Sequence, residues 1–215
     1  MQRINDSFLK ILNRQVPLHN KRILDIGCGD GERSADLAAE CQFLVGIDPS
    51  PKCIARARER QISNAVFYRC SMETLPFRSR RFGVVLFALS LHHIKPQKMS
   101  KAIDRAISLT QNNGHIVFLE PASVGSLYEA EAYFDAWDGD EREQKRAAQE
   151  AIEKHPKLVL FQEMTDEVRF EFKSPKDFVA SMEPKRNHED IELFLNRYKY
   201  CLTAKRTISI FTVRQ

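Results

Sequence analysis

The chain has 215 residues, which is enough for one domain, or one domain with an insertion, built around a sizeable core. Its net charge of +4 is too small to indicate nucleic-acid binding by itself. The longest apolar stretch, near residues 84–91, is far shorter than the ~20 residues of a membrane-spanning helix, so we expect no membrane span.

The first 120 residues alternate between helix-like and strand-like patterns. Residues 1–20 lack the apolar region of a signal peptide and are predicted to form an amphipathic helix with Ile4, Phe8, Ile11 and Leu12 on one stripe. Short apolar runs predict strands at 22–26, 43–47, 65–68, 82–89 and 115–119. Periodicity and capping signals predict helices at 30–40, 50–60 and 99–107. Such alternation is typical of βαβ units in a parallel sheet. The uninterrupted run at 84–89 indicates a strand buried on both faces.

The pattern changes after Pro121. A charge-rich helical stretch covers 126–154, with a break near Gly139. Further on, we expect a strand at 168–172, a helix capped by Ser174, a helix at 190–198 and a final strand at 207–213. The sequence therefore predicts one domain, 1–215, with a helical insertion at 123–165. The insertion's apolar stripe, Leu127, Tyr133, Phe134 and Trp137, either packs on the sheet edge or covers a pocket as a lid.

Three glycines stand at alternate positions in "ILDIGCGDGE", directly after the strand at 22–26. Glycine tolerates unusual dihedral angles and lets a ligand lie against the main chain. In a parallel sheet, that ligand binds at the carboxyl ends of the strands. Asp48 ends the next strand, where a carboxylate can accept hydrogen bonds from both hydroxyls of a ribose. The two features together favour a nucleotide site over a simple tight turn.

The details of this loop disfavour a dinucleotide. The dinucleotide fingerprint is G-x-G-x-x-G, and Glu32 stands here in place of its third glycine. Asp25, two positions before Gly27, would repel a pyrophosphate but suits a cation. S-adenosylmethionine carries a sulfonium and an ammonium against one carboxylate, so it fits an acidic strand end better than a nicotinamide cofactor does.

Five segments in order resemble the motifs of class I S-adenosylmethionine-dependent methyltransferases: "LDIGCGDGERSADLA", "GIDPSP", "CSMETLPF", "RFGVVLFALSLHHI" and "GHIVFLEP". The resemblance covers residues 20–121. It is greatest to the small-molecule branch (methyltransferase type 11) that includes the ubiquinone and menaquinone biosynthesis enzymes. It implies an α/β, Rossmann-like fold with a seven-stranded, mostly parallel sheet in the order 3-2-1-4-5-7-6, helices on both faces and an antiparallel last strand. One departure is Gly83, where the family often has Asp; this position lies at the far end of its strand from the cofactor.

The resemblance also implies which residues contact S-adenosylmethionine. They lie in the glycine loop and at the ends of the next strands: Asp25, Gly27 and Gly29 around the methionine part, with Cys28 in the same loop, Asp48 on the ribose, Pro49 along the adenine, Ser71 and Met72 flanking the adenine, and Phe87 and Ala88 near the transferred methyl group.

Methyl transfer from a sulfonium is an in-line displacement that needs a general base only if the acceptor carries a proton. His92 and His93 follow the strand at 82–89 and are candidates for a base or a substrate contact, or they pack and cap locally. Glu120 ends the next strand and either contacts the substrate or bonds its own loop. Tyr128 is a further candidate substrate contact.

The five cysteines are scattered and form no CxxC pair, which is typical of a reduced, cytoplasmic protein. Their spacing does not resemble a metal-ligand set, so we expect structural thiols and no metal site. Basic residues at 183–188 and 204–206 lack the interleaved aromatics of single-stranded RNA binders, which favours a solvent-facing role for them.

We therefore predict methyl transfer from S-adenosylmethionine to a small-molecule acceptor. The alternatives are a non-catalytic protein that binds this cofactor and an RNA methyltransferase; a nicotinamide-dependent enzyme ranks last. The acceptor, its accepting atom and the oligomeric state stay open.

Overall fold

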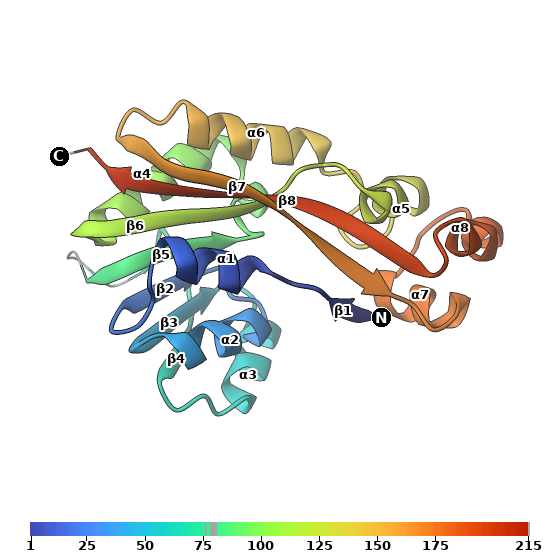
Figure 1. Ribbon diagram of the computed structural model, residues 1–215, viewed down its shortest axis with the longest axis horizontal. Coiled ribbons are helices and arrows are strands. Elements are labelled where there is room, and N and C mark those ends of the chain that lie inside the picture. Colours follow the sequence, from blue (N-terminus) through green and yellow to red (C-terminus); the bar gives the residue numbers. More distant parts are fainter. Residues whose placement is uncertain (76, 78–80, 215) are drawn as a thin grey trace.

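A sheet with helices on both faces runs through the computed structural model, which describes residues 1–75, 77 and 81–214 (Figure 1). Pro76 of the motif CSMETLPF lies outside these residues. The strands are β1 (Gln2–Ile4), β2 (Arg22–Ile26), β3 (Phe43–Asp48), β4 (Ala65–Arg69), β5 (Phe82–Ala88), β6 (Thr110–Pro121), β7 (Leu158–Glu171) and β8 (Cys201–Val213). The helices are α1 (Phe8–Gln15), α2 (Glu32–Glu40), α3 (Pro51–Glu59), α4 (Pro96–Leu109), α5 (Ser126–Phe134), α6 (Arg142–Glu153), α7 (Pro175–Met182) and α8 (Ile191–Arg197), with 3-10 turns η1 (Leu91–His93) and η2 (His188–Asp190).

The strand order across the sheet is β1-β7-β8-β6-β5-β2-β3-β4. Strands β2 to β6 pair in parallel, whereas β8 runs antiparallel to both β6 and β7. Numbered from β2 and without β1, this order is 3-2-1-4-5-7-6, and its last strand is the antiparallel one. The Rossmann-like fold class is therefore confirmed, and the parallel strands place their carboxyl ends at one edge of the sheet.

The expected number of strands, seven, is wrong by one. Gln2–Ile4 forms β1, an edge strand antiparallel to β7 from Arg169 to Glu171. The helix expected over 1–20 is correspondingly reduced to α1, because Asn5 has a φ of 56° that no helix can accommodate. A strand of three residues depends on its partner for every hydrogen bond, so the local sequence could not indicate it.

The helical insertion is also shorter than 123–165. It contains α5 and α6, and β7 begins at Leu158 and pairs with β8 along almost the whole length of both strands. Val159, Leu160 and Phe161 are consecutive, apolar and exposed, so this part of β7 has no alternation to reveal it. Strand β8 likewise begins at Cys201, before the expected residue 207.

Successive residues of the central strands alternate between two apolar layers. On one face, Val85 and Phe87 of β5 belong to a cluster that includes side chains of α4 and α6. On the other, Val84 and Leu86 belong to a cluster that includes side chains of α1, α2 and α3. This arrangement confirms that β5 is buried on both faces. Two helix starts are capped as expected: Ser50 accepts from the Cys53 amide, and Ser174 accepts from the Asp177 amide.

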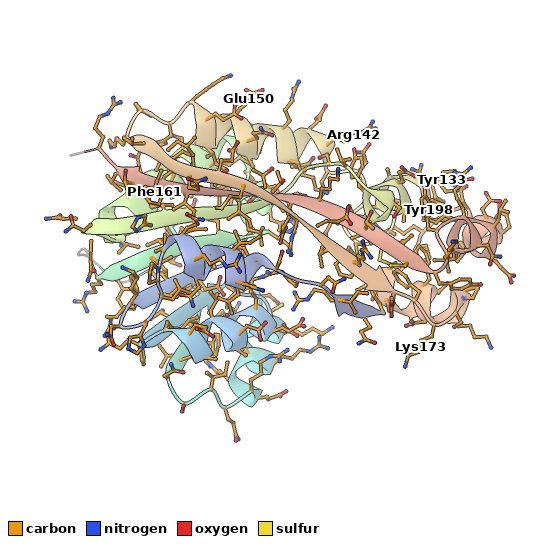
Figure 2. All side chains as sticks on the ribbon, viewed as in Figure 1. Tyr133, Arg142, Glu150, Phe161, Lys173 and Tyr198 are labelled. Atoms are coloured by element: carbon orange, nitrogen blue, oxygen red, sulfur yellow. The ribbon has the colours of Figure 1, made fainter. Side chains whose placement is uncertain are left out.

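A third apolar cluster fills the space where β7 and β8 extend beyond the parallel strands (Figure 1). Helices α5, α7 and α8 contribute Phe134, Phe178 and Leu195 to it, against Phe172 and Leu202. Figure 2 shows Tyr133 and Tyr198 at this end of the molecule, next to α5 and α8. The insertion is thus anchored by its own core rather than hanging free over the sheet.

A buried ionic cluster joins the N-terminal segment to the β7–β8 hairpin. The Arg206 guanidinium donates to Asp166 (Nε to Oδ1, 2.8 Å) and to Asp6 (Nη2 to Oδ1, 2.7 Å). Burial opposes ionisation of Asp6, but hydrogen bonding to Arg206 and the charges of Arg206 and Arg33 outweigh it and lower its pKa to about 2. Because Arg206 is buried here, the expectation that residues 204–206 face solvent is wrong for this residue.

Candidate functional site

The glycine loop joins the end of β2 to the start of α2. Gly27, Gly29 and Gly31 all have positive φ, at 72°, 56° and 80°. The amides of Gly27 and Cys28 donate to the carbonyl of Ile47 at 2.8 and 3.0 Å, which holds the loop against the end of β3. The loop therefore lies at the carboxyl edge of the parallel strands, where ligands of such folds bind.

Two of these glycines have different surroundings. A Cβ atom on Gly27 would lie 2.5 Å from Cβ of Ser90, in the turn after β5, so Gly27 is required for packing within the fold. A Cβ atom on Gly29 would meet nothing within 4 Å. Gly29 thus exposes bare backbone to open space, as a loop that receives a ligand must.

Asp25, near the end of β2, has an incomplete set of partners. Its side chain is 1% exposed, and Oδ2 accepts a hydrogen bond of 2.6 Å from Ser34. Its Oδ1 is buried without a hydrogen-bond partner among the described residues. Burial raises the pKa of this carboxyl to about 6, despite the bond from Ser34. A buried carboxyl group with a free oxygen beside a ligand loop is a site for a cationic or hydrogen-bond-donating group.

Asp48 fastens the same loop from the end of β3. Its Oδ2 accepts from the Gly29 amide at 3.1 Å, and its Oδ1 accepts from the Ser50 amide at 2.8 Å. Each carboxylate oxygen keeps further lone-pair capacity for a ligand hydroxyl. Pro49 follows at the surface.

Of the remaining predicted cofactor residues, some line a cavity and others are buried in the core. Ser71 and Met72 follow β4 and line a cavity of about 260 Å³ on the α4 side of the sheet. Ala88 is half-buried at the end of β5, whereas Phe87 is fully buried and stacks on Phe118 at 5.2 Å. Cys28 is buried, and burial raises the pKa of its thiol far above the usual value, so it is a packing residue of the loop.

The two histidines and Glu120 form a cluster under the start of α6. Nδ1 of His92 is hydrogen-bonded to Oε2 of Glu120, whose Oε1 accepts from the Leu91 amide at 3.1 Å. His93 Nδ1 lies 3.3 Å from Oε1 of Glu141, and this hydrogen bond raises the pKa of His93. His92 is 4% exposed, whereas the His93 side chain is 47% exposed.

Glu141 and Lys145 also belong to this cluster, although the sequence analysis did not single them out as site residues. Lys145 is buried, with Nζ 3.6 Å from Oε2 of Glu141 and 3.3 Å from Oε2 of Glu131. Helical spacing could have indicated that Lys145 is buried, because it lies on the same inner face of α6 as Ala148 and Ile152. Figure 2 shows Arg142 and Glu150 on the outer side of that helix.

A cavity of about 360 Å³ lies beyond the carboxyl ends of β5 and β6; we call it the insertion cavity. Its lining includes apolar or aromatic side chains of the insertion and its surroundings: Leu89, Leu127, Tyr128, Trp137, Val168 and Phe170. Arg3, Arg33, Lys145, Lys205 and Arg206 line it as well. Among the predicted substrate residues, Tyr128 contributes to this lining, whereas Glu120 lines a neighbouring cavity beneath α6.

Comparison with known proteins decides what kind of domain holds this loop. Residues 23–114 match a family model described as a methyltransferase domain. The segment that holds the glycine loop is therefore similar to methyltransferase domains. The resemblance of the glycine loop and following motifs to class I methyltransferases is thereby confirmed. The domain supplies β2 to β5, the glycine loop and the two histidines.

Curated relatives match the methyltransferase domain over a similar region. The chain is 32% identical over 95 residues to an uncharacterized methyltransferase of Synechocystis, across 41% of this chain and 44% of that protein. It is 35% identical over 103 residues to a ubiquinone biosynthesis O-methyltransferase of Coxiella burnetii, across 46% of this chain and 44% of that protein. The matches thus span less than half of each relative.

Solved structures share the fold over nearly the whole chain. A putative methyltransferase of Bacillus halodurans has a TM-score of 0.65 at 13% identity, with coverage of 98% of this chain and 100% of that one. The N-methyltransferase NodS of Bradyrhizobium japonicum, in complex with S-adenosyl-L-homocysteine, has a TM-score of 0.54 at 17% identity, covering 94% and 85%. The α5–α6 insertion and the β7–β8 hairpin therefore belong to the same fold as the methyltransferase domain.

Proposed function

We propose that the protein transfers a methyl group from S-adenosylmethionine to a small, largely apolar acceptor. The observation that carries the proposal is Asp25, whose buried carboxyl group has a free oxygen beside the glycine loop. A ligand with an ammonium and a sulfonium supplies the positive charge and donors that this carboxyl group lacks. The open space at Gly29 and the oxygens of Asp48 complete a site that fits this cofactor.

The chain's own contribution to the chemistry is placement and exclusion of water. The bound cofactor would supply an electrophilic methyl group. Proximity and alignment of an acceptor can contribute up to ~7–11 kcal/mol to lowering the barrier of such a displacement. Leu89, directly after β5, lines the insertion cavity, so the cavity opens at the strand end that the resemblance assigns to the methyl group. The imidazoles of His92 and His93 face Glu120 and Glu141 and do not line this cavity, so the proposed transfer does not use them as a base.

The apolar and aromatic part of the cavity lining supports a small apolar or aromatic acceptor, because Arg33, Lys145 and Arg206 in this lining are paired with carboxylates. Leu127, Tyr128 and Trp137 bring the insertion over the cavity, as the lid hypothesis requires, while Phe134 packs in the third core. The insertion therefore has both proposed roles: part of it packs in the core and part of it covers the cavity. Arg206 is bound to Asp6 and Asp166, so it is not available to an RNA phosphate, and nothing favours the RNA alternative.

The described chain contains no helix long and apolar enough to cross a bilayer, and all five cysteines are free. The free cysteines support a reduced, cytoplasmic setting as part of the proposal.

Turnover of methyl-labelled S-adenosylmethionine with fractionated metabolite extracts tests the proposal. We expect label to appear in a low-molecular-weight product and the demethylated cofactor to accumulate with it. Cofactor binding without transfer to any fraction would indicate a binding protein instead. Label in RNA, with binding that weakens steeply as salt rises, would indicate the RNA alternative.

Alanine at Gly27 should act mainly on stability, whereas alanine at Gly29 should act mainly on cofactor affinity. Gly27→Ala should lower the free energy of unfolding by about 2–5 kcal/mol, because Cβ meets Ser90 and φ is positive. Gly29→Ala should lower it by only about 1–2 kcal/mol, yet weaken cofactor binding more than tenfold, because its Cβ projects into the ligand space. Urea unfolding and calorimetric titration measure the two effects. Equal cofactor affinity in Gly29→Ala and the parent would contradict the placement of the ligand.

Two tyrosines on α5 allow a matched test of the acceptor site. Tyr128 lines the insertion cavity, whereas Tyr133 is exposed and hydrogen-bonded to Asp190 at the far side of the helix. Tyr128→Ala should raise KM for the acceptor found in the labelling screen by about tenfold, with cofactor affinity unchanged. Tyr133→Ala should leave both unchanged. Identical acceptor kinetics in the two variants would remove the insertion cavity from the proposal.

A further inference from the structure

One cluster of side chains has no role in the proposed methyl transfer. His92 and His93 of η1 meet Glu141, the residue that precedes α6, where the insertion lies against the turn after β5. Each of the three offers one metal-ligating atom, and these atoms all lie within 4.8 Å of one another. The cluster is formed by tertiary packing between two segments that are distant in the sequence.

The spacing of the atoms matches a coordination sphere. Nδ1 of His93 lies 3.3 Å from Oε1 of Glu141, and Nε2 of His92 lies 3.7 Å from Oε2. Two ligands at ~2.0–2.1 Å from a tetrahedral zinc ion are about 3.3–3.4 Å apart. All three ligating atoms lie within 4.8 Å of one another, so shifts of up to about 1.5 Å would complete the coordination.

A second carboxylate orients the first imidazole. Glu120 is hydrogen-bonded to Nδ1 of His92 and is held by the amide of Leu91. When Nδ1 donates its proton to Glu120, the lone pair of Nε2 is directed to the Glu141 side. A carboxylate on the far nitrogen of a ligating histidine is the usual outer partner in metal sites.

The charge around the cluster is predominantly negative. Glu120, Glu141 and Asp138 act on His93, and Glu131 lies close by. Lys145 offsets part of this charge through its contacts with Glu131 and Glu141. The side chains of His92 and Glu141 are 4% and 12% exposed, so this excess of negative charge is poorly solvated. A divalent cation would balance it.

We propose that His92 Nε2, His93 Nδ1 and the Glu141 carboxylate bind one divalent transition-metal ion of the zinc type. Two imidazole nitrogens favour zinc or cobalt over magnesium and calcium, which prefer oxygen ligands. The half-exposed His93 provides an entry path and leaves a fourth position for water. The ion joins the start of α6 to the turn after β5, and so fastens the insertion beside its cavity. The site does not depend on the proposed methyl transfer.

Cobalt and zinc titrations test the site on the whole chain, purified without a polyhistidine tag and freed of metal by a chelator. We expect one Co²⁺ per chain, with the visible absorption of a four-coordinate ion, displacement by Zn²⁺ and a higher midpoint of thermal unfolding. His93→Ala and Glu141→Gln should each lose this binding, and Glu120→Gln should weaken it about 10–100-fold. His19→Ala, which removes an exposed histidine elsewhere, is the matched control and should bind as the parent does.

Three results would overturn the proposal, provided that circular dichroism shows folded variants. The first is no uptake of Co²⁺ or Zn²⁺ below about 0.1 mM. The second is equal uptake by the parent and His93→Ala. The third is an absorption band from thiolate bound to cobalt, which would assign the ion to cysteine. Cofactor binding, measured separately, distinguishes failure of this site from failure of the methyltransferase proposal.

Discussion

Replacing Asp25 with Asn is expected to weaken S-adenosylmethionine binding by about 10–100-fold, because a hydrogen bond to a charged group contributes about 1.5–3 kcal/mol. The substitution keeps the shape of the side chain and one acceptor for Ser34. It removes the negative charge that faces the ligand loop. The same reasoning predicts that affinity in the parent rises between pH 5 and 7, as a carboxyl group with a pKa of about 6 ionises.

The stability of the ligand-free protein should depend on pH in the opposite direction to the cofactor affinity: it should fall as the pH rises. Because folding raises the pKa of Asp25 from 3.8 to about 6, the folded state holds its proton more tightly than the unfolded state does. This contribution to stability is present below pH 4 and is lost as pH rises through 6, a loss of about 3 kcal/mol by pH 7. Asp25→Asn should therefore be more stable than the parent at pH 7 and equal to it near pH 4.

Calorimetric titration and urea unfolding at both pH values measure these effects. Asp30→Asn is the matched control, since Asp30 lies in the same loop but is half-exposed and paired with Arg60. That variant should change neither affinity nor stability by more than about 0.5 kcal/mol. If Asp25→Asn kept the parent's affinity, the carboxyl group would not be a ligand contact.

Asp166→Ala is expected to lower the free energy of unfolding by about 3–5 kcal/mol, which is a large share of the stability of a typical domain. The side chains of Asp166 and Arg206 are 2% and 3% exposed, so the substitution leaves a buried guanidinium without its main partner. Because Asp6 still pairs with Arg206 in this variant, we expect a loss toward the lower end of this range. The substitution would also loosen the N-terminal segment from the β7–β8 hairpin.

Chemical unfolding of Asp166→Ala, Asp166→Leu, Arg206→Met and the double variant Asp166→Leu/Arg206→Met measures how much the ion pair contributes to stability. Removal of both charges should restore most of the lost stability, because the remaining carboxylate of the cluster, Asp6, keeps Arg3 and Arg33 as partners. Fully additive losses in the double variant would show that packing, and not charge pairing, sets the effect. In the parent, the Asp6 contribution is present above pH 4 and is lost as pH falls toward 2.

The local parts of the site were predictable from the sequence. The glycine loop, Asp25 and Asp48 follow short apolar strands, and a parallel sheet brings such strand ends to one edge. The parallel strands and their helices have local signals: alternation of element types, Ser50 as a cap and the uninterrupted run of β5. The resemblance of the motifs to class I methyltransferases then implied the strand order.

Features that depend on distant partners were not predictable in this way. Strand β1 exists because Gln2–Ile4 pairs with residues 169–171 of β7, which are far away in the sequence. Phe161 is exposed on the first part of β7, which has neither alternation nor burial to indicate a strand. In the sequence, Glu141 and Lys145 belong to a charged run typical of a surface helix; only the packing of α6 on η1 largely buries them. The sequence indicated no metal site for the same reason: its three proposed ligands converge only in the folded chain.

Calorimetric titration of the ligand-free protein with S-adenosylmethionine and with its demethylated product tests the central claim most directly. We predict saturable binding at one site with Kd below about 0.1 mM for S-adenosylmethionine, and weaker binding in Asp25→Asn. Absence of measurable heat for both compounds at about 1 mM would contradict the assignment of the acidic strand end and glycine loop to this cofactor.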